Sequence, residues 1–326
     1  MKKTVCVIVV LLTVAFCFAG GGGESTDKTA DWPEKGKNMI LLCPMAAGGG
    51  MDINMRMLAP FLEKHLGVKV TVQNVVGAGG WVCWTQLLKA KPDGYTISGA
   101  NYPTKIAGYL DPASNVPYTF RDFTLLSSYV VDINVLVCRT DETRFRTAAE
   151  MVNYAKRNEV TVFNGGRGSD DHVLTVEVNL KLGTKFKPVH MGQTGEGVAN
   201  MLGGHIDGLV CNVSDIYQRY KEGDLKVLAV FSRERVSLMP DVPTFEEAGF
   251  PGLYGDTCRG VVAPPNMDPV LKEKFLRALK AVMTDPEHVA MAAKSGILIT
   301  AMLGSDFEKY VGEVERKMKE LMPSLD

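Results

Sequence analysis

Two glycine-rich loops contain the residues of this chain that are best suited to binding a ligand. They span Cys43–Asp52 and Asn74–Gly80, and each follows an apolar, strand-like run and opens a helical pattern. Glycine lets the main chain approach a ligand closely, and the first turn of a helix presents unbonded N–H groups and a partial positive charge. This pattern predicts an anion site. Neither loop has the lysine or the glycine spacing of a phosphate-binding fingerprint, so a carboxylate is favoured over phosphate.

The second half of the chain repeats the same arrangement. Strand-like runs lead into loops at Asn164–His172, Gly192–Gly197 and Asn212–Asp215. In the first of these, Arg167 stands between two glycines, where its guanidinium could hold a second carboxylate through a bidentate pair of hydrogen bonds. The alternative is a solvated loop charge or a partner for Asp170.

Other polar residues at these strand ends have two interpretations each. Asp52 could contact ligand or cap its helix, and Ser169 could do both. His172 could pack near the helix start or contact ligand. The full set of predicted ligand contacts is Met45, Ala46, Ala47, Gly48, Gly49, Asp52, Gly77, Ala78, Gly79, Asn101, Arg167, Gly168, Ser169, His172, Thr194, Asn212 and Asp215.

An enzyme is the rival class. Ser169 and His172 lie three residues apart beside Asp170 and Asp171, which would suit a hydrolase, but no nucleophile-elbow motif accompanies them. Adjacent residues such as Asp170, Asp171 and His172 rarely converge on one metal ion without further ligands. We therefore expect no catalytic residue, no metal and no cofactor.

The elements that must position these loops alternate between β-branched runs and helical patterns from Met39 almost to the end. That alternation predicts an α/β fold with largely parallel sheets. If the chain crosses into a second lobe near Asn134 and returns near Gly260, ligand would bind between two sets of strand-end loops. The expected domains are a discontinuous first domain, 38–134 with 260–326, and an inserted second domain, 135–259.

Composition excludes some partners. The chain has 326 residues and a formal net charge of −1, with no basic stripe, so nucleic-acid binding is not expected. Five cysteines of the mature part are scattered and lack metal-site spacing, which is typical of small buried side chains. We expect a monomer.

The N-terminus has the plan of a secretory signal. Lys2 and Lys3 precede an apolar run from Val5 to Phe18, which is short for a membrane span. Cleavage after Ala19 would leave a flexible leader over 20–37 and a periplasmic protein. The alternative is a lipoprotein anchored through Cys17, which the bulky Phe16 disfavours.

Taken together, the chain resembles the Bug family, the extracytoplasmic solute receptors of tripartite tricarboxylate transport systems (TctC-like). Collinear blocks carry the resemblance: Pro44–Asp52, Asn74–Gly80, Ala90–Thr96, Gly166–His172, Leu202–Asp207, Asp241–Gly249 and Gly260–Pro264. The resemblance implies a two-lobed periplasmic binding protein of the type II, Venus-flytrap kind. It also implies that the first two loops hold one carboxylate through main-chain groups and water, and that the inserted lobe recognises the rest of the ligand.

The implied partners are a small carboxylate and the membrane subunits of a transporter; a sensory receptor that serves a signalling protein is the alternative. The chain departs from the family at Met45, where an aromatic residue is usual, and at Asp170 and Asp171, where apolar residues or proline are usual. These departures leave the identity of the carboxylate open.

Overall fold

The computed structural model describes residues 32–325, so the expected signal segment and most of the expected leader lie outside the described residues. Within them, Trp32 is buried and its ring centre lies 4.6 Å from that of Phe275. The expectation of a flexible leader that reaches Lys37 is therefore wrong at its end, because a packed indole fixes the chain there.

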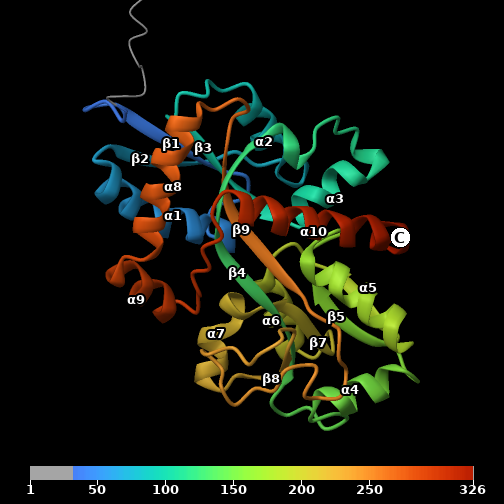
Figure 1. Cartoon of the computed structure of the whole chain (residues 1–326). Helices are drawn as coiled ribbons and strands as arrows, with labels where there is room; N and C mark the ends of the chain where they lie inside the picture. Colours follow the sequence, from blue (N-terminus) through green and yellow to red (C-terminus); the bar gives the residue numbers. More distant parts are fainter. Residues whose placement is uncertain (1–31, 326) are drawn as a thin grey trace, which may run out of the picture.

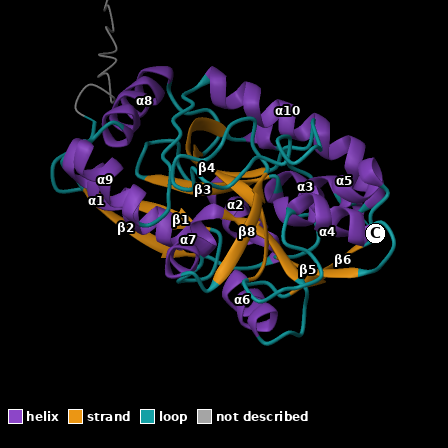
Figure 2. Cartoon of the chain, turned by 90° about the horizontal axis from the view of Figure 1, so that it is seen from below, coloured by secondary structure: helices purple, strands orange, loops and turns teal. Residues whose placement is uncertain are grey.

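The chain forms two α/β lobes, with helices packed against a sheet in each (Figure 1, Figure 2). The first lobe contains the following elements: β1 (Asn38–Cys43), α1 (Gly50–Leu66), β2 (Lys69–Asn74), η1 (Ala78–Gly80), α2 (Trp81–Leu88), β3 (Thr96–Tyr102), α3 (Thr104–Leu110), the short turns η2 (Pro112–Ser114) and η3 (Phe120–Asp122), β9 (Asp256–Ala263), α8 (Pro269–Met283), α9 (Pro286–Lys294), α10 (Ser305–Leu321) and η4 (Met322–Ser324).

The second lobe is built from the middle of the chain. Its elements are α4 (Ala148–Ala155), β5 (Val160–Asn164), α5 (Asp170–Leu182), β6 (Phe186–His190), α6 (Thr194–Leu202), β7 (Gly208–Asn212), α7 (Val213–Glu222) and β8 (Leu225–Val230). Strands β5, β6 and β7 run parallel, so the loops that follow them emerge at one edge of this sheet.

One long strand, β4 (Thr124–Arg139), belongs to both lobes. Its first part pairs with β9 and its last part pairs with β7 and β8, which gives the strand order β2-β1-β3-β9-β4-β7-β5-β6. Strand β9 starts where β4 enters the second lobe, since Asp256 pairs with Ile133. The two lobes are therefore joined by adjacent strands, as Figure 1 shows near its centre.

The sequence pattern predicted only Val135–Cys138 of this strand. The missed part carries Ser127, Ser128, Asp132 and Asn134, all of which are buried. Polar residues interrupt the apolar run by which a buried strand is recognised, so hydropathy underestimates its length.

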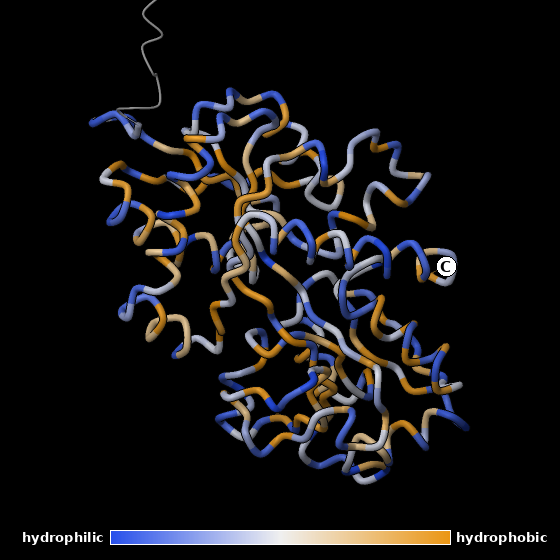
Figure 3. Tube along the Cα trace, viewed as in Figure 1, coloured by the Kyte–Doolittle hydropathy of each residue, from blue (hydrophilic) through white to orange (hydrophobic). Residues whose placement is uncertain are grey.

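Hydrophobic residues follow one another along the central strands, and hydrophilic residues are frequent in the outer loops (Figure 3). The buried apolar residues of strands and helices form the core of each lobe. No helix within residues 32–325 is long and apolar enough to cross a membrane. The predicted two-lobed α/β fold is confirmed. Boundaries at 134/135 and 259/260 stay a prediction, since both strands continue through them.

Candidate functional site

The first glycine loop joins β1 to α1 and offers fewer free donors than its sequence suggests. The N–H of Gly48, where φ is +82°, donates to Asp52 Oδ2 at 2.9 Å, and the N–H of Gly49 donates to a carbonyl of the same loop at 3.3 Å. Among the described residues, no acceptor bonds the N–H groups of Gly50 and Met51, the first two of α1. The N–H of Asp52 is likewise unbonded within residues 32–325, so the first turn of α1 has donors left for an anion.

Asp52 shapes this loop from inside the first lobe. The helix begins at Gly50, so the expectation that Asp52 is the N-cap is wrong; Gly49 takes that position. The buried carboxylate also accepts from Arg56 Nε at 2.9 Å and Asn74 Nδ2 at 2.8 Å. Burial alone would raise the pKa of Asp52, but these donors outweigh it and lower the pKa. The remaining predicted residues of the loop are half-buried or exposed: Met45, Ala46 and Ala47.

The second glycine loop turns sharply before α2. Gly77, Ala78, Gly79 and Gly80 all have positive φ. A Cβ at Gly80 would lie 2.8 Å from the ring of Trp84, so this position requires glycine. The N–H groups of Ala78 and Gly79 bond no acceptor within residues 32–325, and both residues are exposed. This loop thus offers a second pair of main-chain donors.

A buried ion pair lies at the junction of the lobes. Arg259 Nη1 of β9 is 2.8 Å from Asp132 Oδ2 of β4, and it also donates to Ser214 Oγ at 3.4 Å. A Cβ at Gly50 would lie 3.0 Å from Arg259 Nη2 and 3.4 Å from Asp215 Oδ1. The N-terminus of α1 therefore meets Arg259 and the second lobe's Asp215 directly.

Sequence reasoning missed Arg259. Its signal was a single charged residue inside an otherwise apolar strand, which is a costly position unless the charge is paired. Burial disfavours the guanidinium, but Asp132, Asp215 and Asp170 together raise the pKa of Arg259. It is therefore a permanent cation in this cleft.

Asp215, in the first turn of α7, is a predicted residue whose carboxylate lies beside Arg259 at the start of α1. Its side chain accepts from Thr194 Oγ1 at 2.9 Å. Loss of hydration raises the pKa of Asp215 to about 6, although Arg259 opposes the shift. The residue is nevertheless exposed. A carboxyl group that solvent can reach but that has lost much of its hydration lies in a concave cleft.

Two predicted amides lie at strand ends beside this cleft but are held by protein partners. Asn101 accepts from Thr257 Oγ1 at 2.7 Å. Asn212 donates to Asp170 Oδ2 at 2.9 Å and to the main-chain carbonyl of Asp132 at 3.2 Å. Both side chains connect the junction strands to the loops around them.

Arg167 joins the two lobes away from Arg259. Its Nη1 lies 2.6 Å from Asp111 Oδ2 of the first lobe, so the alternative in which it pairs with Asp170 is wrong. The neighbouring Gly168 also approaches the first lobe, because a Cβ there would lie 2.6 Å from Ala107 Cβ. Contact of Arg167 with a ligand stays a prediction.

Ser169 and His172 do not form a nucleophile–base pair. Ser169 Oγ donates to the carbonyl of Gly166 at 2.6 Å and contacts Asp171. His172 is buried and its Nδ1 accepts from the N–H of Gly168 at 3.1 Å. Burial, His190 and Arg167 lower the pKa of His172 to about 4. Ser169 precedes α5 as predicted, but its hydroxyl makes no capping bond. No metal-holding group of His, Cys, Asp or Glu occurs within the described ranges.

Several known proteins are similar to this chain in sequence or in structure. BugT of Bordetella pertussis is 28% identical over 289 residues, which cover 88% of each chain. A TctC solute-binding protein from Polaromonas, solved without ligand, has 25% identity and a TM-score of 0.75, and covers 90% of this chain and 99% of its own. MatC from Rhodopseudomonas palustris, solved with malate, has the same fold at 22% identity and a TM-score of 0.74, covering 89% of this chain and 99% of its own.

The family model described as "Tripartite tricarboxylate transporter family receptor" (TctC) matches residues 54–326, which is more than half of the chain. The match begins after the first glycine loop, so the anion-binding role of that loop rests on its geometry alone. The chain belongs to the TctC family of tripartite tricarboxylate transporter receptors.

Proposed function

We propose that this protein is an extracytoplasmic receptor that captures a small organic carboxylate between its lobes and delivers it to a membrane transporter. The observation that carries the proposal is the pair of sets of unbonded main-chain donors on the first lobe. Gly50 and Met51 supply one set, and Ala78 and Gly79 supply the other. Four main-chain donors at helical N-termini suit an oxyanion.

The chemistry of the site favours reversible binding. Main-chain donors hold an anion without a titrating group or a nucleophile, so the ligand leaves unchanged. The family is one of binding proteins, and the hydrolase alternative is therefore wrong. Across the cleft, the hydroxyl of Thr194 is a polar group that would meet the rest of the ligand.

The relatives support this ligand class without naming the ligand. MatC binds malate, a small carboxylate, and its likeness to this chain is one of fold. A thermal-shift screen against a panel of carboxylates would identify the solute, since a ligand at ~100 times its Kd adds about 2.7 kcal/mol to folded-state stability.

The variant Gly50→Pro tests the main-chain grip. Proline is tolerated at the first position of a helix, and Gly49, with φ −77° and ψ 163°, has the extended backbone that precedes proline. The change removes one donor N–H and adds a Cβ that would lie 3.0 Å from Arg259 Nη2. Calorimetric titration with the screened carboxylate should show binding weaker by about 1.5 to 3 kcal/mol, the scale of a hydrogen bond to a charged group.

Gly50→Ala is the matched control. It adds the same Cβ beside Arg259 but keeps the N–H, so any steric loss appears in both variants. Equal affinities of the two variants would mean that the N–H of Gly50 does not contact the ligand, and would overturn the proposed grip.

Export is part of the proposal. The basic start, apolar run and small residues before Gly20 predict removal of the segment that ends at Ala19. Intact-mass measurement of protein recovered from the cell envelope should show a chain that begins at Gly20. A mature chain that keeps Lys2 and Lys3 contradicts export, and a lipid on Cys17 supports the anchored alternative.

A further inference from the structure

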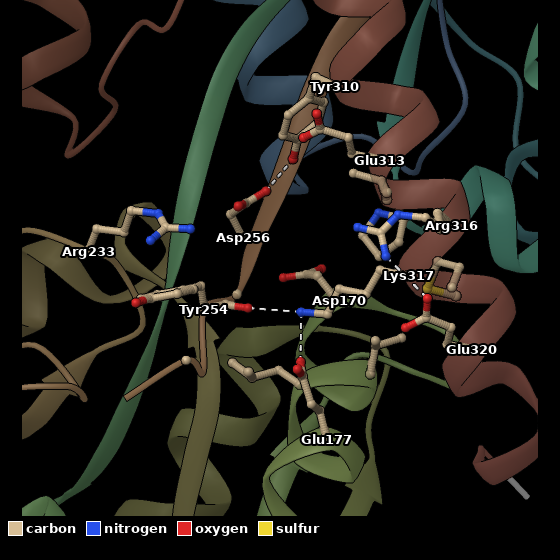
Figure 4. Close-up of a pocket in the computed structure, with 17 residues that line it drawn as sticks. Asp170, Glu177, Arg233, Tyr254, Asp256, Tyr310, Glu313, Arg316, Lys317 and Glu320 are labelled. Carbon is tan, nitrogen blue, oxygen red and sulfur yellow. Dashed lines mark hydrogen bonds and ion pairs between the residues drawn. The ribbon is translucent and has the colours of Figure 1, made fainter. Parts of the chain in front are cut away.

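A second space between the lobes lies on the other face of β9. It is a cavity of about 430 Å³ between α5 of the second lobe and α10 of the first (Figure 4). Side chains alternate along a strand, so Asp256 faces this cavity while Arg259 faces α1. The residues on its walls are Pro103, Asp170, Val173, Leu174, Glu177, Arg233, Gly252, Tyr254, Gly255, Asp256, Tyr310, Glu313, Val314, Arg316, Lys317, Met318 and Glu320.

Acidic groups outnumber basic groups on these walls. Two of the cations already have carboxylate partners: Lys317 Nζ lies 2.6 Å from Glu177 Oε2, and Arg316 Nη1 lies 3.1 Å from Glu320 Oε1. Arg233 lies over the ring of Tyr254, 4.5 Å from its centre. Such a contact shows that the aromatic face at this rim accepts a cation.

Asp256 and Asp170 receive hydrogen bonds from neutral groups. The hydroxyl of Tyr310 donates to Asp256, and the amides of Asn134 and Asn212 donate to Asp170 at 2.7 and 2.9 Å. No cation lies within 4.0 Å of either carboxylate in the part of the chain that the structure describes. Burial raises the pKa of both groups, because dehydration disfavours the anion more than the positive charges of Arg259, near Asp170, and Lys317, near Asp256, favour it.

One buried acceptor behind the cavity wall has no donor. Asn134 is fully buried, and its Oδ1 bonds no partner among the described residues. A Cβ at Gly255 would lie 2.8 Å from this oxygen and 2.5 Å from Leu174, so the oxygen lies against the wall that Gly255 and Leu174 form. This oxygen is not reached from the cavity, so it is not counted among the contacts of a ligand there.

We propose that the cavity between α5 and α10 binds a small organic amine, with its ammonium group between Asp170 and Asp256 and its carbon chain against Leu174, Val314 and Met318. An organic cation fits better than a metal ion, because one wall is apolar and the described residues contain no metal-holding group. The proposal does not depend on the carboxylate site, since no wall residue belongs to the glycine loops.

The cavity would also link amine binding to the arrangement of the lobes. Its walls come from both lobes, and in the same structure the α1 terminus already lies beside Asp215 across the carboxylate cleft. An amine that bridges α5 and α10 therefore stabilises the arrangement in which that cleft is narrow. Coupling of this kind is reciprocal, so each ligand should raise affinity for the other.

Calorimetric titration of the full-length mature protein with putrescine tests the proposal. Putrescine should bind, whereas butanediol, its uncharged analogue, should not. The variant Asp256→Asn keeps a partner for Tyr310 but loses the charge, and should weaken putrescine binding about tenfold. Glu313→Gln, at an exposed wall position, should weaken it by a smaller factor and serves if Asp256→Asn does not fold.

Asp241→Asn, an exposed position away from the cavity, is the charge-matched control and should leave putrescine affinity unchanged. Equal binding of butanediol, unchanged putrescine affinity in both cavity variants, or no putrescine binding to the wild type would each overturn the proposal. Carboxylate titration of the same variants separates this result from the proposed function, because the glycine loops are unaltered.

Discussion

The two faces of strand β9 differ in whether a buried charge has an ion-pair partner. On the face toward α1, Arg259 and Asp132 form an ion pair whose side chains are 6% and 4% exposed. On the face toward α10, Asp256 has only the hydroxyl of Tyr310 and an open cavity beside it. Arg259 and Asp256 both lie in β9, which begins at Asp256 where β4 enters the second lobe.

This difference indicates that one face contributes mainly to stability and the other mainly to ligand binding. A paired buried charge is satisfied within the protein, so its loss should appear mainly as lost stability. A dehydrated carboxylate beside a cavity has no ion-pair partner, so its loss should appear mainly as lost affinity for a cation. Variants on each face test whether this division is correct.

Arg259→Met should give the largest effect, a loss of folding stability. It leaves the buried carboxylate of Asp132 without its cation, which typically costs about 3 to 5 kcal/mol of folding free energy. Urea unfolding measures the loss. Adding Asp132→Asn to the same chain should recover part of it, because the uncompensated charge is then gone. A loss below about 1 kcal/mol, or no recovery in the double variant, would show that the pair is not the main support of the junction.

Asp215→Asn should give an intermediate effect that depends on pH. The pKa of Asp215 is raised from 3.8 to about 6 in the folded chain, so the folded state binds more protons than the unfolded state between these values. The contribution to stability is therefore complete below pH 3.8 and is lost as pH rises through 6. The difference in stability between wild type and variant should change between pH ~4 and ~6, and should be flat above pH ~7.

Unfolding curves across this range give the measurement, with Asp224→Asn, at an exposed position just after α7, as control. Because Asp215 is exposed, solvent screening keeps the change below that of Arg259→Met. Parallel pH profiles of wild type and Asp215→Asn would mean that the cleft does not dehydrate this carboxyl group.

Arg167→Ala should give the smallest effect, a slight weakening of carboxylate binding. Its partner Asp111 lies in the other lobe and the Arg167 side chain is 43% exposed, so the pair should contribute about 1 kcal/mol or less. Asp111→Asn should weaken carboxylate binding by the same small amount, because both variants remove one contact between lobes. A loss of about 1.5 to 3 kcal/mol in Arg167→Ala alone would instead establish the predicted direct contact with ligand.

The sequence pattern predicted the α/β class, the two lobes and the places where glycine loops follow strands. These follow from local physics: β-branched runs form strands, apolar residues at helical spacing form helices, and glycine allows the positive φ that Gly80 and Gly48 show. It did not predict which loop donors remain free. Gly48 and Gly49 looked suitable, but their N–H groups bond Asp52 and the loop itself.

The sequence by itself determined that this chain would build two sets of strand-end loops and place them across a junction near Asn134 and Gly260. Only the tertiary structure decided that Arg259, Asp132 and Asp215 meet there. These residues are far apart in the chain and come together through the pairing of β9 with β4 and the packing of α7. Local patterns report propensity and burial, whereas the partner of a buried charge depends on which strands become neighbours.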